Sequence, residues 1–156
     1  LLNYFYDINP IFSPDGNIIL FESDRGEFGY DGFSNLFLLI LSNKKIFQLT
    51  NGKFKDSFPH WTEFDNSILF SSDRDGSVNI WRFDSLQVKK LYQSLNDQKL
   101  ENLKLTRHTN SVTNAIEVQW VNKNTTKIIF TAFENYSFQI FSMEDIDTPS
   151  SKCFYI

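Results

Sequence analysis

Apolar residues occur along the chain in short runs that polar turns separate. Residues 36–41 are continuously apolar, as expected for a strand covered on both faces. Residues 45–50 alternate instead, with Phe47 and Leu49 facing one way and their polar neighbours the other. Pro and Gly in residues 14–17 provide the φ angles that a tight turn needs. This pattern predicts four strands in the first third of the chain, at residues 10–13, 18–22, 36–41 and 45–50.

The pattern then repeats 49 residues later without a gap. A repeat of about 20 to 50 residues is typical of arrays in which each unit packs only on its neighbours. The second copy predicts strands at 59–62, 67–71, 79–83 and 88–93, with an insertion near 94–102. Seven pairs keep this spacing: Asp7 and Asp56, Pro10 and Pro59, Phe12 and Trp61, Phe21 and Phe70, Ser23 and Ser72, Asp24 and Asp73, and Arg25 and Arg74. Gly26 and Gly76 end the motif in both copies, with Gly76 one position later in the second.

A third copy is more diverged but keeps the same order. Its strands are predicted at 117–121, 127–132, 138–143 and 151–156, and Ala132-Phe133-Glu134 replaces the Ser-Asp-Arg element. Leu105-Thr106 is predicted to end the second copy, as Leu49-Thr50 ends the first. The residues at 122–125, and Asp65-Asn66 in the second copy, are expected to make the turn that Pro14-Asp15-Gly16 makes in the first.

Composition supports an all-β domain. The 156 residues suffice for one domain, and 17 Phe, 6 Tyr and 3 Trp favour half-buried, pleated surfaces. The net charge of −4, with mixed signs along the chain, argues against nucleic-acid binding. The longest apolar run, at residues 36–41, is far shorter than the roughly 20 residues that span a bilayer. A single cysteine, Cys153, excludes an internal disulfide and leaves the redox compartment open.

The repeat resembles the blade of TolB-type β-propellers. The resemblance is carried by residues 10–26, 35–37, 49–50, 59–76 and 79–81. It implies a ring of four-stranded antiparallel blades, commonly six in that family. We therefore expect a partial propeller, with blade one at about 8–50, blade two at about 56–106 with the insertion near 94–102, and blade three at about 115–156.

The resemblance also implies a function. Many such proteins are exported to the periplasm or cell surface of bacteria, so we expect a non-catalytic binding or scaffolding module for protein–protein or cell-envelope interactions. An accessory propeller of a larger prolyl-oligopeptidase-like serine hydrolase is the alternative. Three blades do not close a ring. The chain begins and ends within a repeat, so we expect the remaining blades of the same polypeptide, or else a second copy, to cover the open faces.

Chemistry within the segment is not expected. His60 and His108 lack metal-ligand spacing, and Asp73-Arg74-Asp75-Gly76 lacks the Glu that closes a calcium loop, so no metal or other cofactor is predicted. Residues 32–36 lack the second glycine of a nucleophile elbow, and Cys153 has no evident base. The sequence therefore predicts no enzyme activity of its own.

Four charged residues recur in the motif: Asp24, Arg25, Asp73 and Arg74. They could form a charged ring at one mouth of the propeller, suited to anionic peptide termini. We favour a structural role, in which each Asp accepts hydrogen bonds from loop N–H groups and each Arg pairs with a neighbouring blade.

Aromatic residues divide into two sets. Equivalent rings in successive blades are expected to fill the inter-blade core, rather than to form a stacking platform for sugars or bases. They are Phe12, Trp61 and Trp120, and Phe21, Phe70 and Phe130. Rings in or beside loops of variable length are the better candidates for contacting a partner protein, namely Tyr30, Phe33, Tyr136 and Phe138.

Overall fold

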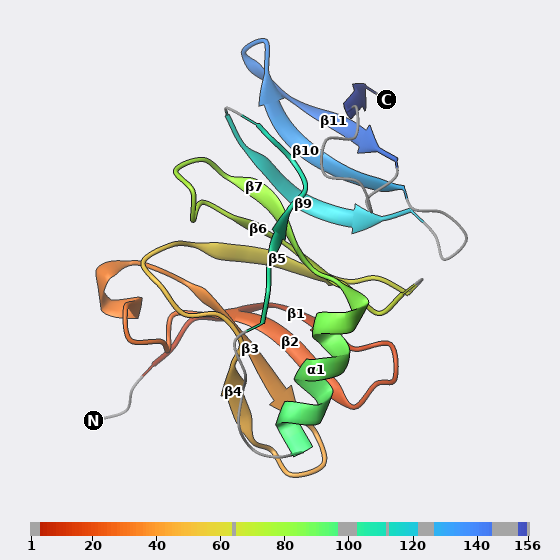
Figure 1. The fold of residues 1–156 in the computed structure, drawn as a ribbon. Coiled ribbons are helices and arrows are strands. Elements are labelled where there is room, and N and C mark those ends of the chain that lie inside the picture. The colour runs from red at the N-terminus through yellow and green to blue at the C-terminus, as the bar shows by residue number, and fades with distance from the viewer. Residues whose placement is uncertain are drawn as a thin grey trace.

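The chain forms three four-stranded antiparallel sheets that follow one another along the sequence (Figure 1). The computed structural model describes residues 4–63, 65–96, 103–111, 113–121, 127–144 and 153–155. In each sheet the spatial order of the strands is their order in the chain, so neighbouring strands are also consecutive. The predicted all-β fold of about three propeller blades is thus confirmed.

The elements have the following bounds. Blade one contains β1 (Asp7–Phe12), β2 (Ile18–Ser23), β3 (Asn35–Ile40) and β4 (Ile46–Gln48). Blade two contains β5 (Asp56–Trp61), β6 (Ile68–Ser72), β7 (Asn79–Phe83) and β8 (Thr106–Arg107). Blade three contains β9 (Ala115–Trp120), β10 (Ile128–Glu134), β11 (Ser137–Met143) and β12 (Cys153–Tyr155). A short 3-10 helix, η1 (Gly29–Asp31), follows β2, and α1 (Ser85–Asn96) joins β7 to β8.

The blades pack face to face through apolar side chains. Leu20 and Leu36 of blade one pack with Phe70 of blade two, and all three are fully buried. On the other side of blade two, Leu69 packs with Phe130 of blade three. Successive residues of a strand point to opposite faces, so Leu69 and Phe70 serve two different interfaces. Each such side chain contributes about 1.5–3 kcal/mol of burial free energy.

All but one of the six predicted core aromatics are buried or partly buried: Phe21 is covered by Arg25 and Phe37 of its own blade, and Trp120 packs partly buried on the core of blades two and three. Trp61, Phe70 and Phe130 are buried as expected, and Phe21 and Phe70 occupy equivalent positions, each opposite an aromatic residue of the third strand. Phe12 is largely exposed, so its assignment to the core is wrong. The reason is that, in the described part of the chain, no other blade packs on its side of blade one.

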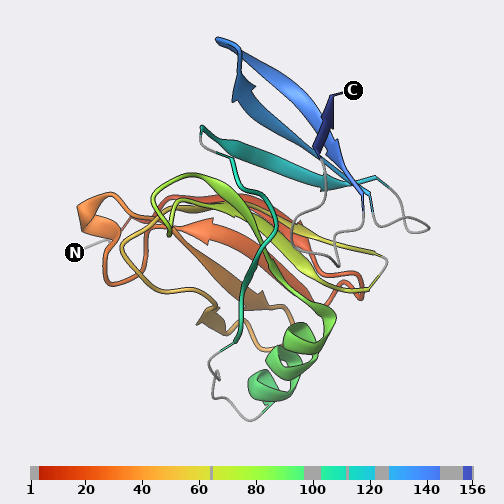
Figure 2. The same ribbon diagram turned by 45° about the horizontal axis from the view of Figure 1, so that its top comes forward.

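Residues 88–93, predicted as the fourth strand of blade two, belong instead to α1. Asp84 caps this helix, because its Oδ1 accepts a hydrogen bond from the Gln87 N–H at 2.9 Å. Val88, Leu91 and Leu95 recur at helical spacing and are buried against the core that blades one and two share. Figure 2 shows α1 beside these two blades. The helical segment therefore begins well before the predicted insertion near 94–102, whose residues 97–102 lie outside the described part of the chain.

The fourth strand of blade two is β8, so the second repeat ends later in the sequence than predicted. Thr50 Oγ1 accepts a hydrogen bond from the Leu36 N–H at 2.9 Å, and Thr109 Oγ1 accepts one from the Ile80 N–H at the same distance. Thr109, not Thr106, is therefore the counterpart of Thr50, and matching Leu105-Thr106 to Leu49-Thr50 was wrong. The residue that replaces Leu49 is His108, whose backbone N–H donates to the Ile80 carbonyl.

The turn between the first two strands is the same in blades one and two despite different sequences. Gly16 and Asn66 both have positive φ, 70° and 56°. Ser13 Oγ donates to Asp15 and Thr62 Oγ1 donates to Asp65, each at 2.6 Å. Asp65-Asn66 thus makes the predicted reversal, whereas residues 122–125 of blade three fall among the undescribed residues.

Candidate functional site

The two Ser-Asp-Arg segments build the same aromatic cluster in blades one and two. The guanidinium carbon of Arg25 lies over the rings of Phe5, Phe21 and Phe37, at 5.1, 5.3 and 5.7 Å from their centroids. Such cation–π contacts hold a charge against apolar surface. In blade two the equivalent contacts join Arg74 to Phe54, Phe70 and Trp81, at 4.4, 5.2 and 5.1 Å.

Each arginine also pairs with the aspartate that begins the first strand of its own blade. Arg74 Nη2 lies 2.7 Å from Asp56 Oδ1, and Arg25 forms the same pair with Asp7. The expectation that these arginines pair with a neighbouring blade is therefore wrong. The pairing is local because the first strand runs antiparallel to the second, which places Asp56 opposite Ser72, two residues before Arg74.

The motif aspartates bind the segment that leads into the blade. Asp24 Oδ1 accepts a hydrogen bond from the Tyr6 N–H at 2.9 Å, and Asp73 Oδ1 accepts one from the Lys55 N–H at 2.7 Å. These are backbone N–H groups, as predicted, but they belong to the residues before the first strand rather than to the motif's own loop. Each aspartate thus fixes the entry of the chain into its blade.

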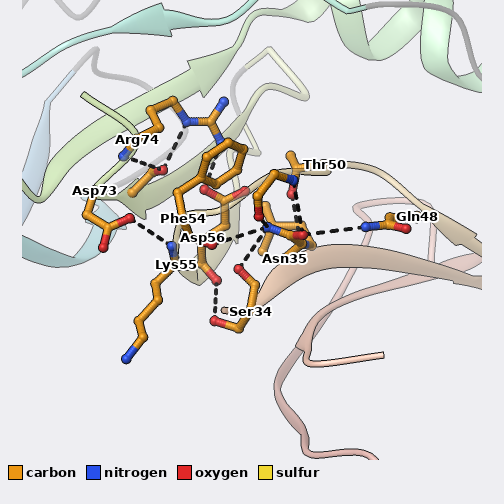
Figure 3. Close-up of polar contacts among 12 residues, drawn as sticks. Ser34, Asn35, Gln48, Thr50, Phe54, Lys55, Asp56, Asp73 and Arg74 are labelled. Atoms are coloured by element: carbon orange, nitrogen blue, oxygen red, sulfur yellow. Dashed lines mark hydrogen bonds and ion pairs between the residues drawn. The ribbon is translucent and has the colours of Figure 1, made fainter. Parts of the chain in front are cut away.

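A buried asparagine, Asn35, holds the connection between blades one and two (Figure 3). Its Nδ2 donates to the carbonyls of Ser34, Gly52 and Phe54, at 3.0, 3.4 and 3.3 Å. The Asp56 N–H then donates to the Ser34 carbonyl at 2.8 Å. Asn35 therefore stabilises the connection between the blades, because it donates hydrogen bonds to backbone carbonyls that lie outside the strands.

This geometry favours a structural role for the motif. Asp56 has no exposed surface and so cannot contact a ligand, whereas Asp7 is 44% exposed. Burial raises the pKa of the Asp56 carboxyl, and the Arg74 guanidinium opposes that rise. The structural assignment of Asp24, Arg25, Asp73 and Arg74 stays a prediction, which substitutions argued below test.

A groove with a volume of about 630 Å³ lies along the first strands of the three blades. Each of these strands contributes three consecutive residues, 9–11, 58–60 and 117–119, which occupy matching places in the repeat. Ile129 and Thr131 of β10 and Ile140 of β11 extend the wall on blade three. The groove therefore combines equivalent positions of all three blades.

A backbone irregularity recurs where each first strand meets the groove. Asn9, Phe58 and Glu117 have φ of 51°, 51° and 55°, in the left-handed region that bulky residues rarely adopt. At each of these places the pairing register shifts by a β-bulge. Bulges re-aim side chains and concentrate near functional sites, and a strained residue persists only where its surroundings hold it.

Glu22 lies next to this groove and links blades one and two. Its carboxylate is buried and accepts hydrogen bonds from Asn9 Nδ2 at 3.1 Å and Ser34 Oγ at 3.0 Å. Burial raises the pKa of Glu22, while these hydrogen bonds and one from the Phe58 backbone N–H lower it. The Asp56 carboxylate adds to the rise.

The two histidines do not form one site. His60 lies in the groove wall, and its Nε2 accepts a hydrogen bond from the Trp120 N–H at 3.2 Å. Burial lowers the pKa of His60, which favours the neutral ring that this bond requires. His108 lies after β8 at the outer edge of blade two. Within the described ranges, no group of three or more His, Cys, Asp and Glu could hold a metal ion.

The predicted contact residues lie in two separate connections. Tyr30 is in η1 and is almost fully exposed, while Phe33, at the end of the same β2–β3 connection, is half-buried. Tyr136 is at the tip of the β10–β11 hairpin, and Phe138 belongs to β11 and contacts Phe133 edge-on. The structure does not test whether they bind a partner.

The groove was missed from the sequence. Its signal is present, because Asn9-Pro10 and Phe58-Pro59 occupy the same place in the first two copies. Proline lacks the N–H that a sheet ladder needs, so within a sheet it is confined to edge strands, strand starts and bulges, and these pairs are compatible with an irregular strand. The third bulge, at Glu117, has no proline and leaves no such mark.

Comparison with known proteins identifies the fold. No protein-family model matches the chain, and no curated protein matches its sequence. Solved structures do. The chain is similar to TolB from Acinetobacter baumannii, with a TM-score of 0.65 and 20% identity over 94% of this chain and 32% of that one. It is similar to a putative TolB from Agrobacterium tumefaciens, with a TM-score of 0.68 and 16% identity over 97% of this chain and 49% of that one.

Peptidases are also among the similar structures. A putative dipeptidyl aminopeptidase IV from Bacteroides ovatus matches with a TM-score of 0.61 and 15% identity, over 90% of this chain and 21% of that one. The chain thus has a TolB-like β-propeller fold. It spans about a third of the Acinetobacter chain and about half of the Agrobacterium chain. No helix among the described residues is long and apolar enough to cross a membrane.

Proposed function

We propose that this chain is a non-catalytic binding module that holds a polypeptide segment of a partner protein in the groove along β1, β5 and β9. The observation that carries the proposal is the recurrence of a left-handed bulge at Asn9, Phe58 and Glu117. Holding a bulky residue in this conformation costs about 1–3 kcal/mol. A fold that keeps three strained residues at one groove is explained if the bulges direct side chains toward a ligand.

The lining suits a peptide of mixed character. Ile11 and Phe58 offer apolar surface, while Glu117 and Gln119 offer polar groups. Glu117 is exposed, and the described residues that line the groove include no lysine or arginine, so the Glu117 carboxylate favours a basic side chain on the partner. We therefore expect a segment in which a Lys or Arg lies next to apolar residues.

A displayed peptide library, selected against the chain, tests this expectation. Selected peptides should carry a basic residue and should lose at least about tenfold in affinity with Phe58→Gly or Glu117→Gln. Gly accepts the positive φ of Phe58, so this variant removes the ring and keeps the bulge. Glu117→Gln removes the charge and keeps the size.

Matched controls separate the groove from other surfaces. Leu86→Ala changes an exposed residue of α1 and should leave peptide affinity unchanged. Tyr30→Ala and Tyr136→Ala report on the contact loops. Peptides that respond to the tyrosine variants but not to Phe58→Gly or Glu117→Gln contradict the groove and assign binding to the loops.

The setting of this binding is part of the proposal. A TolB-like fold supports a place in the periplasm or at the cell surface of a bacterium, and a cell-envelope protein as the partner. Fractionation of cells that express the native gene checks the compartment. Recovery of the protein with cytosolic markers contradicts it.

An accessory propeller of a larger serine hydrolase is the second candidate. The match to a putative dipeptidyl aminopeptidase IV favours it. In this case the propeller positions a peptide, and the chemistry belongs to a hydrolase domain elsewhere in the polypeptide. A fluorophosphonate label on the native, full-length protein distinguishes the two candidates, since only a serine hydrolase reacts with it.

A further inference from the structure

The two ends of the three-blade arc expose apolar faces of different character. The first, which we call the aromatic end face, belongs to blade one and carries Phe12, Ile19, Leu39 and Ile46 together with the rings of Phe21 and Phe37, which lie on the same side of the sheet. The second, the aliphatic end face, belongs to blade three and consists of Ile129, Thr131, Phe138 and Ile140. Their members lie on the sides of the two sheets that face away from blade two, because the residues next to them in sequence form the inter-blade cores.

Both end faces have buried counterparts inside the molecule. Phe12 is 61% exposed, but Trp61, its equivalent in blade two, is 3% exposed because blade one and Tyr92 of α1 cover it. Ile140 is 56% exposed, but Ile80, its equivalent in blade two, is fully buried because blade three covers it. The exposed faces are therefore halves of an interface that the chain already makes twice.

The internal interfaces show which face fits which. Between blades one and two, the side of blade two that carries Trp61 and Phe70 packs on the side of blade one that carries Leu20 and Leu36. Between blades two and three, the side that carries Phe130 packs on the side that carries Leu69 and Ile80. A face rich in aromatic residues thus packs each time on an aliphatic face. The two end faces are complementary to each other rather than to themselves.

We propose that a second copy of this chain covers both end faces at once. The aliphatic end face of each copy packs on the aromatic end face of the other, and a two-fold axis along the groove relates the copies. Two identical heterologous contacts then close the assembly and leave no open face. The matched part of the Agrobacterium protein is 49% of that chain, so two copies supply about the length of one such propeller. Ile129, Thr131 and Ile140 of the aliphatic end face also line the groove, so the pairing covers this part of the blade-three wall.

Light scattering on the purified chain tests the pairing. The expected mass is twice 18.3 kDa. Phe12→Lys and Ile140→Asp should each weaken the dimer at least about tenfold, since each change places a charge in both contacts. Leu86→Asp is the matched control, because Leu86 is similarly exposed but lies on α1, and it should leave the mass at the dimer value.

Mixing the two variants sharpens the test. In a mixed dimer one contact brings together Lys and Asp, and the other contact joins two unchanged faces. A mixture of Phe12→Lys and Ile140→Asp should therefore recover the dimer mass that neither variant shows alone. Circular dichroism checks that each variant is folded, and Ile46→Lys, on the rim of the aromatic end face, replaces Phe12→Lys if that variant unfolds.

Two outcomes overturn the proposal. A monomeric unchanged chain at high micromolar concentration means that the end faces are covered in another way, such as by further blades of a longer polypeptide. A dimer that responds to only one of Phe12→Lys and Ile140→Asp means that like faces pair with each other.

Discussion

Asp56 and Arg74 form an ion pair of 2.7 Å in which the carboxylate has no exposed surface. The repeat places the same pair, Asp7 and Arg25, in blade one, where the carboxylate is 44% exposed. Blade one covers the pair of blade two, whereas no blade among the described residues covers the pair of blade one. The chain thus contains a natural comparison between a buried and an open version of one motif.

Removing the two arginines should have very different effects on stability. Arg74→Ala leaves a buried carboxylate without its counter-charge and should lower the free energy of unfolding by about 3–5 kcal/mol. Arg25→Ala removes a partly solvated ion pair that contributes about 0–1 kcal/mol. It also removes the cation–π contacts of Arg25 with Phe5, Phe21 and Phe37. Urea denaturation of both variants checks the difference.

The double variant Asp56→Asn, Arg74→Ala serves as the control for this comparison. It removes the buried charge as well as its partner, so it should recover part of the stability that Arg74→Ala loses. Equal losses for Arg25→Ala and Arg74→Ala contradict the account, because burial is the main difference between the two sites.

Glu22 should make stability depend on pH in the direction opposite to a salt-bridged carboxylate. Burial raises its pKa above the ordinary value of 4.5, so the folded state binds a proton more readily than the unfolded state. Its contribution therefore falls as pH rises from about 4.5 through the raised pKa, and is most favourable below that range. Glu22→Gln should remove this fall.

The measurement is the free energy of unfolding of both proteins across pH 4 to 8. Asp15 and Asp65, whose pKa values are lowered, are unchanged in the variant, so the difference between the two curves reports Glu22 together with its coupling to Asp56. The variant should gain stability relative to the unchanged chain as pH rises. Parallel curves contradict a raised pKa for Glu22.

Two leucines on α1 test whether this segment is a helix packed on the blades. Leu91 is fully buried and Leu86 is exposed. Leu91→Ala should lower the free energy of unfolding by about 2–5 kcal/mol, and Leu86→Ala should change it by less than about 0.5 kcal/mol. Thermal denaturation compares them. If both variants lose a similar amount of stability, Leu91 and Leu86 are equally covered, which contradicts the packing of α1 on the blades.

The repeat predicted the sheets because its signal is long and redundant. The pairs Phe21 with Phe70 and Arg25 with Arg74 align without a gap, so each blade supports the assignment of the other. Propensity failed at residues 88–93, where Val88 and Leu91 can belong to a strand or a helix. The Asp84 cap and the spacing to Leu95 favour the helix, and that evidence lies outside the short window.

The environment of each position was less predictable than its secondary structure. Phe12 and Trp61 align in the repeat, yet one is exposed and the other is buried, because only the second has a neighbouring blade on its side. The partner of Arg74 was likewise placed in the wrong blade. The groove depends on backbone bulges at Phe58 and Glu117, and among residue types only glycine indicates a positive φ clearly in a sequence.

Tyr136 should be replaceable by glycine with a gain in stability. It is the second residue of a two-residue hairpin loop between Glu134 and Ser137, and both Asn135 and Tyr136 have positive φ, 49° and 64°. Such loops favour Asn-Gly, so Tyr136→Gly should raise the free energy of unfolding by up to about 1 kcal/mol.

Tyr30→Gly is the control. Tyr30 is nearly as exposed but has negative φ, so glycine there should lower the free energy of unfolding by about 0.5–1 kcal/mol. Thermal melts of the two variants should shift in opposite directions, and a shift in the same direction contradicts the strain assigned to this hairpin.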